Sequence, residues 1–164
     1  MRGTTYKDDS QTENILQLVC FKLADEEYAV DITQVQEVIR MQRITPVPQM
    51  PGFVLGVVNI RGTVVPVFDL RKQFHLTEKE ENPLTKIVVV NLNGELISII
   101  VDEILDNIKL DSIHVDPTPA VKMEIDKESI KGIGMLEERM IIILDLHKIN
   151  DSINRRIVAF KSNI

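Results

Sequence analysis

Short apolar stretches separated by turn residues run through most of the chain, and such alternation is typical of β-strands. The predicted strands cover residues 16–23, 28–31, 37–44, 56–60, 63–69, 86–92, 96–101, 130–136 and 139–145. Single helical turns are predicted at residues 32–36, 70–74 and 146–150. Three prolines between Thr45 and Gly52 exclude a helix or a central strand there and predict a stiff loop. The pattern therefore predicts a mainly β fold.

The strand pattern occurs twice in the sequence. Residues 56–74 align with residues 132–150 without a gap, at an offset of 76 (132 − 56). Upstream of this segment, residues 19–23 align with residues 88–92 at an offset of 69 (88 − 19). Two matches in the same order predict two similar β-units, each the size of a small barrel that leaves no exposed sheet edge.

The polar segment at residues 75–82 separates the two copies and is the best candidate for an internal boundary. We expect one domain over residues 15–150. Its first subdomain would span about residues 28–82 and its second about 86–150, and the N-terminal strand could pack between them. Residues 1–14 are polar and acidic and predict a disordered tail. Residues 151–164 predict a tail or a short helix.

Composition and charge narrow the choice of environment and partner. Hydrophobic residues make up 44% of the chain and aromatic residues 4%, with no tryptophan, so Ile, Val and Leu must build the core. The net charge of −6, without a basic patch, argues against a nucleic-acid partner. The single Cys20 lies in a predicted strand, where we expect it buried and reduced. The sequence shows no signal peptide or membrane-spanning run, so the expected location is cytoplasmic, without membrane insertion.

Catalytic and cofactor motifs are missing from the sequence. The three histidines lie far apart and there is one cysteine, so we expect no metal site and no cofactor. Asp69 and Asp145 each end a predicted strand just before a helical turn, which is typical of helix N-caps and not of acid–base catalysis. We therefore expect no enzyme. The rival interpretation is a small enzyme that uses Asp69, Asp102 or His147 in a pocket between the two units.

The predicted turn at Arg61-Gly62 is the first candidate for a binding site. The repeat places Glu137-Glu138 at the same position, so structural demand alone does not fix these residues. Gly62 permits a positive φ, and Arg61 would then project a five-donor guanidinium from a stiff hairpin, which makes a good interface anchor. The plain alternative is an ordinary solvated arginine at a turn.

The strand at residues 35–39 and the proline-rich loop are two further candidates. Alternation puts Val35, Glu37 and Ile39 on one side of the strand, and Glu37 would be unfavourable in a dry core. That side should therefore border water or line a groove. The loop at residues 46–53 offers Phe53 for contact. For both segments, simple core packing is the alternative.

These segments resemble the CheW family of chemotaxis coupling proteins. The similar stretches are EEYAVDITQVQEVIR, ITPVPQMPGFVLGVVNIRGTVVPVFDLRKQF, TKIVVVNLNGELISIIVDEI and GIGMLEERMIIILDLHKI. The NIRG turn followed by VxPVxDLR is the most specific part, and the resemblance covers about residues 16–150. It implies two five-stranded, SH3-like β-barrels packed around a shared apolar seam.

The resemblance also implies a function and two contact regions. It implies a non-catalytic adaptor that couples the cytoplasmic tips of methyl-accepting chemoreceptors to the regulatory domain of a CheA-type histidine kinase, recruited to the inner face of the membrane through receptor arrays. The expected receptor- and kinase-binding residues are Val35, Glu37, Ile39, Phe53, Asn59, Arg61 and Gly62. A loop expected to contact the kinase contains Pro117, Pro119, Val121 and Met123. The alternatives are an adaptor of another chemosensory array, such as one for surface motility, or a small-ligand-binding module.

Overall fold

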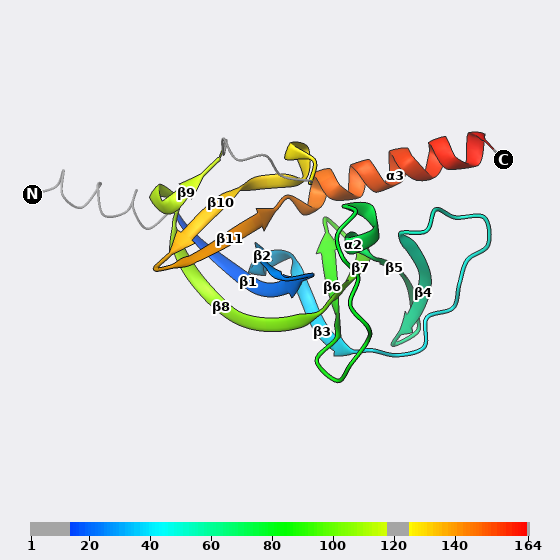
Figure 1. Cartoon of the computed structure of the whole chain (residues 1–164). Coiled ribbons are helices and arrows are strands. Elements are labelled where there is room, and N and C mark those ends of the chain that lie inside the picture. The colour runs from blue at the N-terminus through cyan, green and yellow to red at the C-terminus, as the bar shows by residue number, and fades with distance from the viewer. Residues whose placement is uncertain (1–13, 118–124, 164) are drawn as a thin grey trace, which may run out of the picture.

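Two β-sheets form the body of the molecule, as the computed structural model in Figure 1 shows. The structure describes residues 14–117 and 125–163, so the predicted disordered tail lies outside the described residues except for Asn14. The five-stranded sheet has the order β3 (Val35–Arg40), β6 (Lys86–Leu92), β7 (Glu95–Val101), β5 (Thr63–Phe68) and β4 (Val54–Ile60). The six-stranded sheet has the order β8 (Glu103–Asp111), β1 (Ile15–Leu23), β2 (Glu26–Asp31), β11 (Arg139–Leu144), β10 (Ile130–Leu136) and β9 (Val115–Asp116). The mainly β fold is confirmed.

Helices are short except at the C-terminal end of the described chain. The short ones are η1 (Ile32–Gln34), α2 (Leu70–Gln73), η2 (Ser112–His114) and η3 (Lys127–Ser129). The long one is α3 (Leu146–Ser162), which has 17 residues where the sequence predicted one turn followed by a tail or short helix. The predicted N-caps are confirmed, because Asp69 accepts from the backbone N–H of Arg71 and Asp145 from that of Lys148. Among the described residues, no helix has both the length and the hydropathy needed to cross a bilayer.

The two sequence repeats exchange a hairpin with one another. The β1–β2 hairpin belongs to the first repeat, yet it lies between β8 and β11 of the second. The matching β6–β7 hairpin of the second repeat lies between β3 and β5 of the first. The parallel strand pairs also correspond. Ala29 of β2 pairs with Ile143 of β11, and the equivalent residues Ser98 of β7 and Val67 of β5 pair in the same way. Each sheet is therefore built from both halves of the sequence.

This exchange contradicts the subdomain boundaries expected at residues 28–82 and 86–150. β2 belongs to the six-stranded sheet, whereas β6 and β7 belong to the five-stranded sheet. The N-terminal strand β1 is a full member of the six-stranded sheet, and its Val19, Phe21 and Leu23 pack in the core between the sheets. The polar segment at residues 75–82 is a connector between repeats but not a boundary between sheets. A repeat in sequence defines equivalent strands and does not define which copies pair.

Two equivalent glycines allow each sheet to close on itself. Thr45, which follows β3, bridges to β4, and β9, which follows β8, pairs with β10. A Cβ at Gly56 would lie 2.1 Å from the carbonyl oxygen of Thr45, and one at Gly132 would lie 2.6 Å from that of Asp116. Gly56 also has a φ of 143°, which side chains rarely adopt. The crossing backbones can approach only because neither position carries a side chain.

The core has three parts, which follow from the two closed sheets and the space between them. One apolar cluster fills the interior of the six-stranded sheet, around Cys20, Ala29 and Ile141. A second fills the five-stranded sheet, around Val65 and Val89. The largest lies between the sheets and also takes in side chains of α2 and α3. The shared apolar seam implied by the family resemblance is thus present, and Cys20 is fully buried as predicted.

Candidate functional site

The tight turn predicted at Arg61-Gly62 joins β4 to β5. Arg61 has a φ of 51° and Gly62 a φ of 85°, the left-handed pair that a type I′ hairpin turn requires. The side-chain Oδ1 of Asn59 accepts a hydrogen bond of 2.8 Å from the backbone N–H of Gly62. Asn59 thus holds the turn from within, and the turn presents Arg61 to solvent in a defined direction.

Arg61 forms a two-point ion pair with Glu37 of β3. The distances are 2.9 Å from Nη2 to Oε2 and 3.1 Å from Nη1 to Oε1. The two side chains differ in exposure, because Arg61 is 78% exposed and Glu37 is 19% exposed. The partly buried carboxylate of Glu37 therefore orients the guanidinium, while most of the Arg61 side chain stays exposed to a partner.

The predicted alternation of β3 is wrong at its start. A bulge lies between Val35 and Glu37, so Val35 pairs with Val90 and faces the core between the sheets. Glu37 and Ile39 face the other way, and Ile39 packs on the interior of the five-stranded sheet. The three residues therefore do not share a face. Glu37 pairs with Val89 in the strand ladder, and its partly buried carboxylate is within reach of Arg61.

Phe53 precedes β4 and so lies at the other end of that strand from the Arg61 turn. Its side chain is 8% exposed and belongs to the core between the sheets. The guanidinium of Arg156 from α3 lies 5.9 Å from the centre of the Phe53 ring, and its Nη1 donates to the carbonyl of Gln73. Phe53 was predicted to contact a partner, but its burial makes it a support for the start of β4. Its backbone carbonyl also accepts from the N–H of Asp69 at 2.8 Å.

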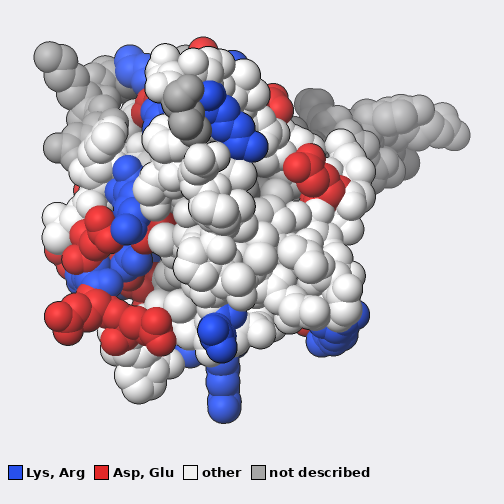
Figure 2. All heavy atoms as spheres, turned by 90° about the vertical axis from the view of Figure 1, so that its right-hand side faces the viewer, with Lys and Arg blue, Asp and Glu red and all other residues white. Residues whose placement is uncertain are grey.

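An exposed apolar residue beside the turn was missed by the sequence analysis. Val64 is 64% exposed and lies directly opposite Asn59 on β5. The next outward pair, Val57 and Pro66, is half-buried. Figure 2 shows that this side of the molecule has a broad uncharged area, with Lys, Arg, Asp and Glu at its margins. Along TVVPVF, Val64 and Pro66 face outward while Val65 and Val67 face inward. That alternation could have identified the exposed surface from the sequence.

The second repeat also has an arginine–carboxylate pair, but its arginine comes from another position and is less exposed. Asp106 of β8 is the counterpart of Glu37, and it pairs with Arg139 of β11 at 2.8 Å. Arg139 also pairs with Glu27 of β2, so it is bound between two carboxylates and is only 33% exposed. Hydrogen bonds from Arg139 hold the pKa of Asp106 below its ordinary value. This group of three residues links three strands, whereas the Arg61 pair links β3 to the β4–β5 turn and leaves its arginine exposed.

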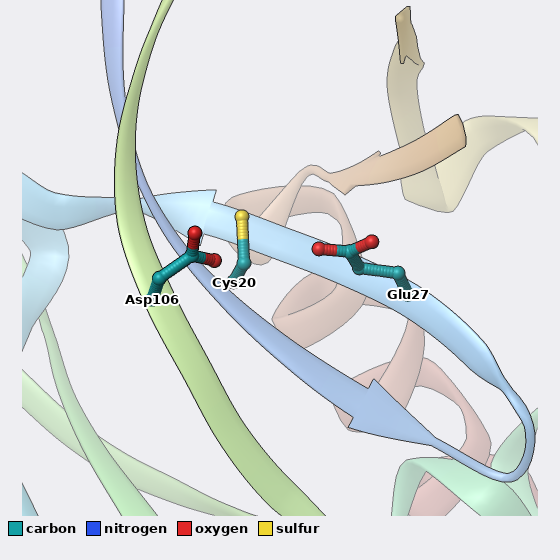
Figure 3. Close-up of side chains that lie close together, drawn as sticks. All are labelled: Cys20, Glu27 and Asp106. Carbon is teal, nitrogen blue, oxygen red and sulfur yellow. The ribbon is translucent and has the colours of Figure 1, made fainter. Parts of the chain in front are cut away.

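Cys20 lies beside the same two carboxylates (Figure 3), and together they form a set of potential metal ligands. Burial, followed by the charges of Asp106 and Glu27, raises the pKa of the Cys20 thiol to about 12. The thiol is therefore protonated at neutral pH and is a poor ligand and nucleophile. Both carboxylates already bind the Arg139 guanidinium, which occupies the place a cation would take. The group works as an internal ion pair.

Two of the carboxylates considered for catalysis belong to a buried structural network. Asp69 accepts from Nε and Nη2 of Arg71, each at 3.0 Å, and Asp102 pairs with Nη1 at 2.7 Å. Asp102 also accepts from the backbone N–H of Ala24 in the β1–β2 turn. The network connects the two sheets at one point. His147, the third residue considered for catalysis, is exposed on α3.

The loop predicted to contact the kinase is described only at its start. Pro117 is exposed and lines a cavity of about 450 Å³ at the end of the six-stranded sheet, together with Asp31, Lys131 and apolar side chains of β1. Pro119, Val121 and Met123 lie outside the described residues. Asp116 pairs with Ile133 as Thr45 pairs with Val57, so Pro117 is the structural counterpart of Pro46.

Comparison with known proteins gives one family. The CheW-like domain family matches residues 17–154. The chain is 33% identical over 136 residues to the chemotaxis protein CheW of Klebsiella aerogenes, covering 83% of this chain and 82% of that protein. It is 34% identical over 140 residues to CheW of Treponema pallidum, with coverage of 83% and 82%. The crystal structure of the scaffolding protein TtCheW from Thermoanaerobacter tengcongensis superposes with a TM-score of 0.75 at 35% identity, covering 80% of this chain and 84% of that one. The chain therefore belongs to the CheW-like family of chemotaxis coupling adaptors.

Proposed function

We propose that this chain is a non-catalytic adaptor that binds the cytoplasmic tips of chemoreceptors and the regulatory domain of a CheA-type kinase. The observation that carries the proposal is the Arg61 turn, whose guanidinium is fixed by Glu37 and yet 78% exposed. A fixed arginine beside apolar side chains is the arrangement that dominates binding energy at many protein interfaces. The chain would work in the cytoplasm and reach the membrane only through the receptors it binds.

The receptor tip is the partner we assign to the Arg61 surface. Val64, Val57 and Pro66 extend from the turn as an uncharged strip on the outward face of β4 and β5. An amphipathic helix of the receptor could lay its apolar side along this strip and place an acidic residue near Arg61. Such an adaptor transmits state by binding one arrangement of its partners more tightly than another.

The kinase regulatory domain is the partner we assign to the region around Pro117. The exposed Pro117 and the neighbouring cavity give an irregular, partly apolar surface at the end of the six-stranded sheet. This region and the Arg61 turn belong to different sheets. Both partners could therefore bind at the same time, as an adaptor requires, and many weak contacts in an array would supply avidity.

Titration calorimetry with a receptor-tip fragment tests the assignment of Arg61. We expect Arg61→Glu to weaken binding by at least about tenfold, because it reverses the charge of an interface anchor. Lys109→Glu, which makes the same charge change on an exposed residue of β8, should leave the affinity unchanged. The double variant Arg61→Glu with Glu37→Arg restores an internal ion pair with the charges exchanged. If the double variant binds normally, the Arg61 charge is structural and the assignment is wrong.

A further inference from the structure

The β10–β11 turn has the same place and strand register as the Arg61 turn but the opposite charge. The two hairpins have identical registers and the same bulge near the start of the first strand. Glu137 has a φ of 56° where Arg61 has 51°. The exposed turn residues are Glu137 and Glu138, whereas the first repeat has Arg61 and Gly62. Strand register and the first turn position are thus shared, whereas the second turn position has a positive φ only at Gly62. The side chains at the tip also differ.

Two methionines flank the acidic turn. Met135 and Met140 lie directly opposite one another on β10 and β11 and are 47% and 48% exposed. Glu137 and Glu138 are exposed and form no ion pair with another described residue. The hairpin therefore ends in two adaptable apolar side chains beside two uncompensated negative charges. Methionine is common at surfaces that adjust to a partner.

We propose that the tip of the β10–β11 hairpin is a second docking surface, for a partner segment that carries lysine or arginine beside an apolar side chain. Charge complementarity selects the basic partner, and the methionine pair receives the apolar side chain. Figure 1 shows this tip on the opposite side of the molecule from β4 and β5. A protein bound here would not compete with one at Arg61. The proposal goes beyond receptor and kinase coupling and does not depend on it.

An NMR titration of the full chain with a designed peptide tests this surface. The probe is a synthetic helical peptide with lysine and leucine at i, i+4 spacing, and its control has glutamate in place of lysine. With a full chain whose methionine methyl groups are isotope-labelled, we expect the lysine peptide to shift the methyl signals of Met135 and Met140. The glutamate peptide should leave both signals in place. Equal shifts with the two peptides would overturn the role of charge.

Three variants separate a specific site from general attraction to an acidic protein. Glu137→Lys combined with Glu138→Lys should weaken binding of the lysine peptide by about fivefold or more. Glu80→Lys combined with Glu81→Lys makes the same charge change in the exposed connector and should have little effect. Arg61→Glu should not weaken it either, so failure of the receptor assignment would not affect this result. If the connector variant weakens binding as much as the hairpin variant, the proposal is wrong.

Discussion

Replacing Arg71 with methionine should strongly destabilise the fold. The guanidinium is the counter-ion of Asp69 and Asp102, whose residues are 1% and 8% exposed. Methionine matches much of the arginine stem but leaves both carboxylates buried without a cation. Removing one partner of a buried pair typically costs about 3–5 kcal/mol. With a urea m-value of roughly 2 kcal/mol/M for a chain of this size, the midpoint should fall by about 1.5–2.5 M.

The assay is urea unfolding at neutral pH, followed by circular dichroism in the far ultraviolet. Lys72→Met is the matched control, because Lys72 is exposed and its contact with Glu78 is 3.6 Å. That control should change stability by less than about 1 kcal/mol. If Arg71→Met lowers the midpoint no more than Lys72→Met does, the network does not join the sheets.

Three further predictions concern the core and the exchanged hairpins. The raised pKa of Cys20 means that its stabilising contribution is present below pH 9 and is lost as the pH rises towards 12. At neutral pH the thiol is protonated, so a thiol reagent should not react with the folded chain. Rapid labelling would contradict this. Gly56→Ala should destabilise the fold by about 3 kcal/mol or more in thermal unfolding, whereas Gly52→Ala, where a Cβ meets nothing within 4 Å, should change little. Fragments 1–84 and 85–164 should each be unfolded alone and regain β-structure when mixed, because each sheet contains strands of both; independent folding of either would contradict the exchange.

Local signals in the sequence predicted the hairpins and the starts of two helices. Turn chemistry located Arg61-Gly62, and both residues have positive φ in the structure. Capping chemistry located Asp69 and Asp145 at the starts of α2 and α3. These features depend on a few adjacent residues, so a single sequence can reveal them. The counterpart relationship between the two hairpins also came from sequence and holds residue by residue.

Features that depend on distant residues were not predictable in the same way. The hairpin exchange is decided by which copy of each strand pairs with which, and equivalent strands carry the same alternation. The bulge after Val35 makes the side chain of Glu37 face away from that of Val35. No glycine or proline in the strand signals this bulge in the sequence. The strand β8 was missed because only Ile108 and Leu110 are buried among its nine residues. The length of α3 follows from Ile153 and Ile157, which pack against the core between the sheets.

The exposure of Arg61 likewise required the structure. Both repeats place an arginine next to the carboxylate of the equivalent strand, as Arg61 with Glu37 and Arg139 with Asp106. From sequence alone, either could have been structural. Arg139 is bound by a second carboxylate, Glu27, and is largely covered, whereas Arg61 has one partner and faces solvent. That difference is what makes the first hairpin the better candidate for a partner.

The most direct test of adaptor function is whether the chain joins the two partners at once. Vesicles carrying the cytoplasmic receptor domain would be sedimented with the labelled kinase regulatory domain, with and without the full chain. We expect the kinase domain to sediment only when the wild-type chain is present, and to remain in solution with Arg61→Glu. Sedimentation of the kinase domain that is independent of the chain, or equal with wild type and Arg61→Glu, would contradict coupling through this surface.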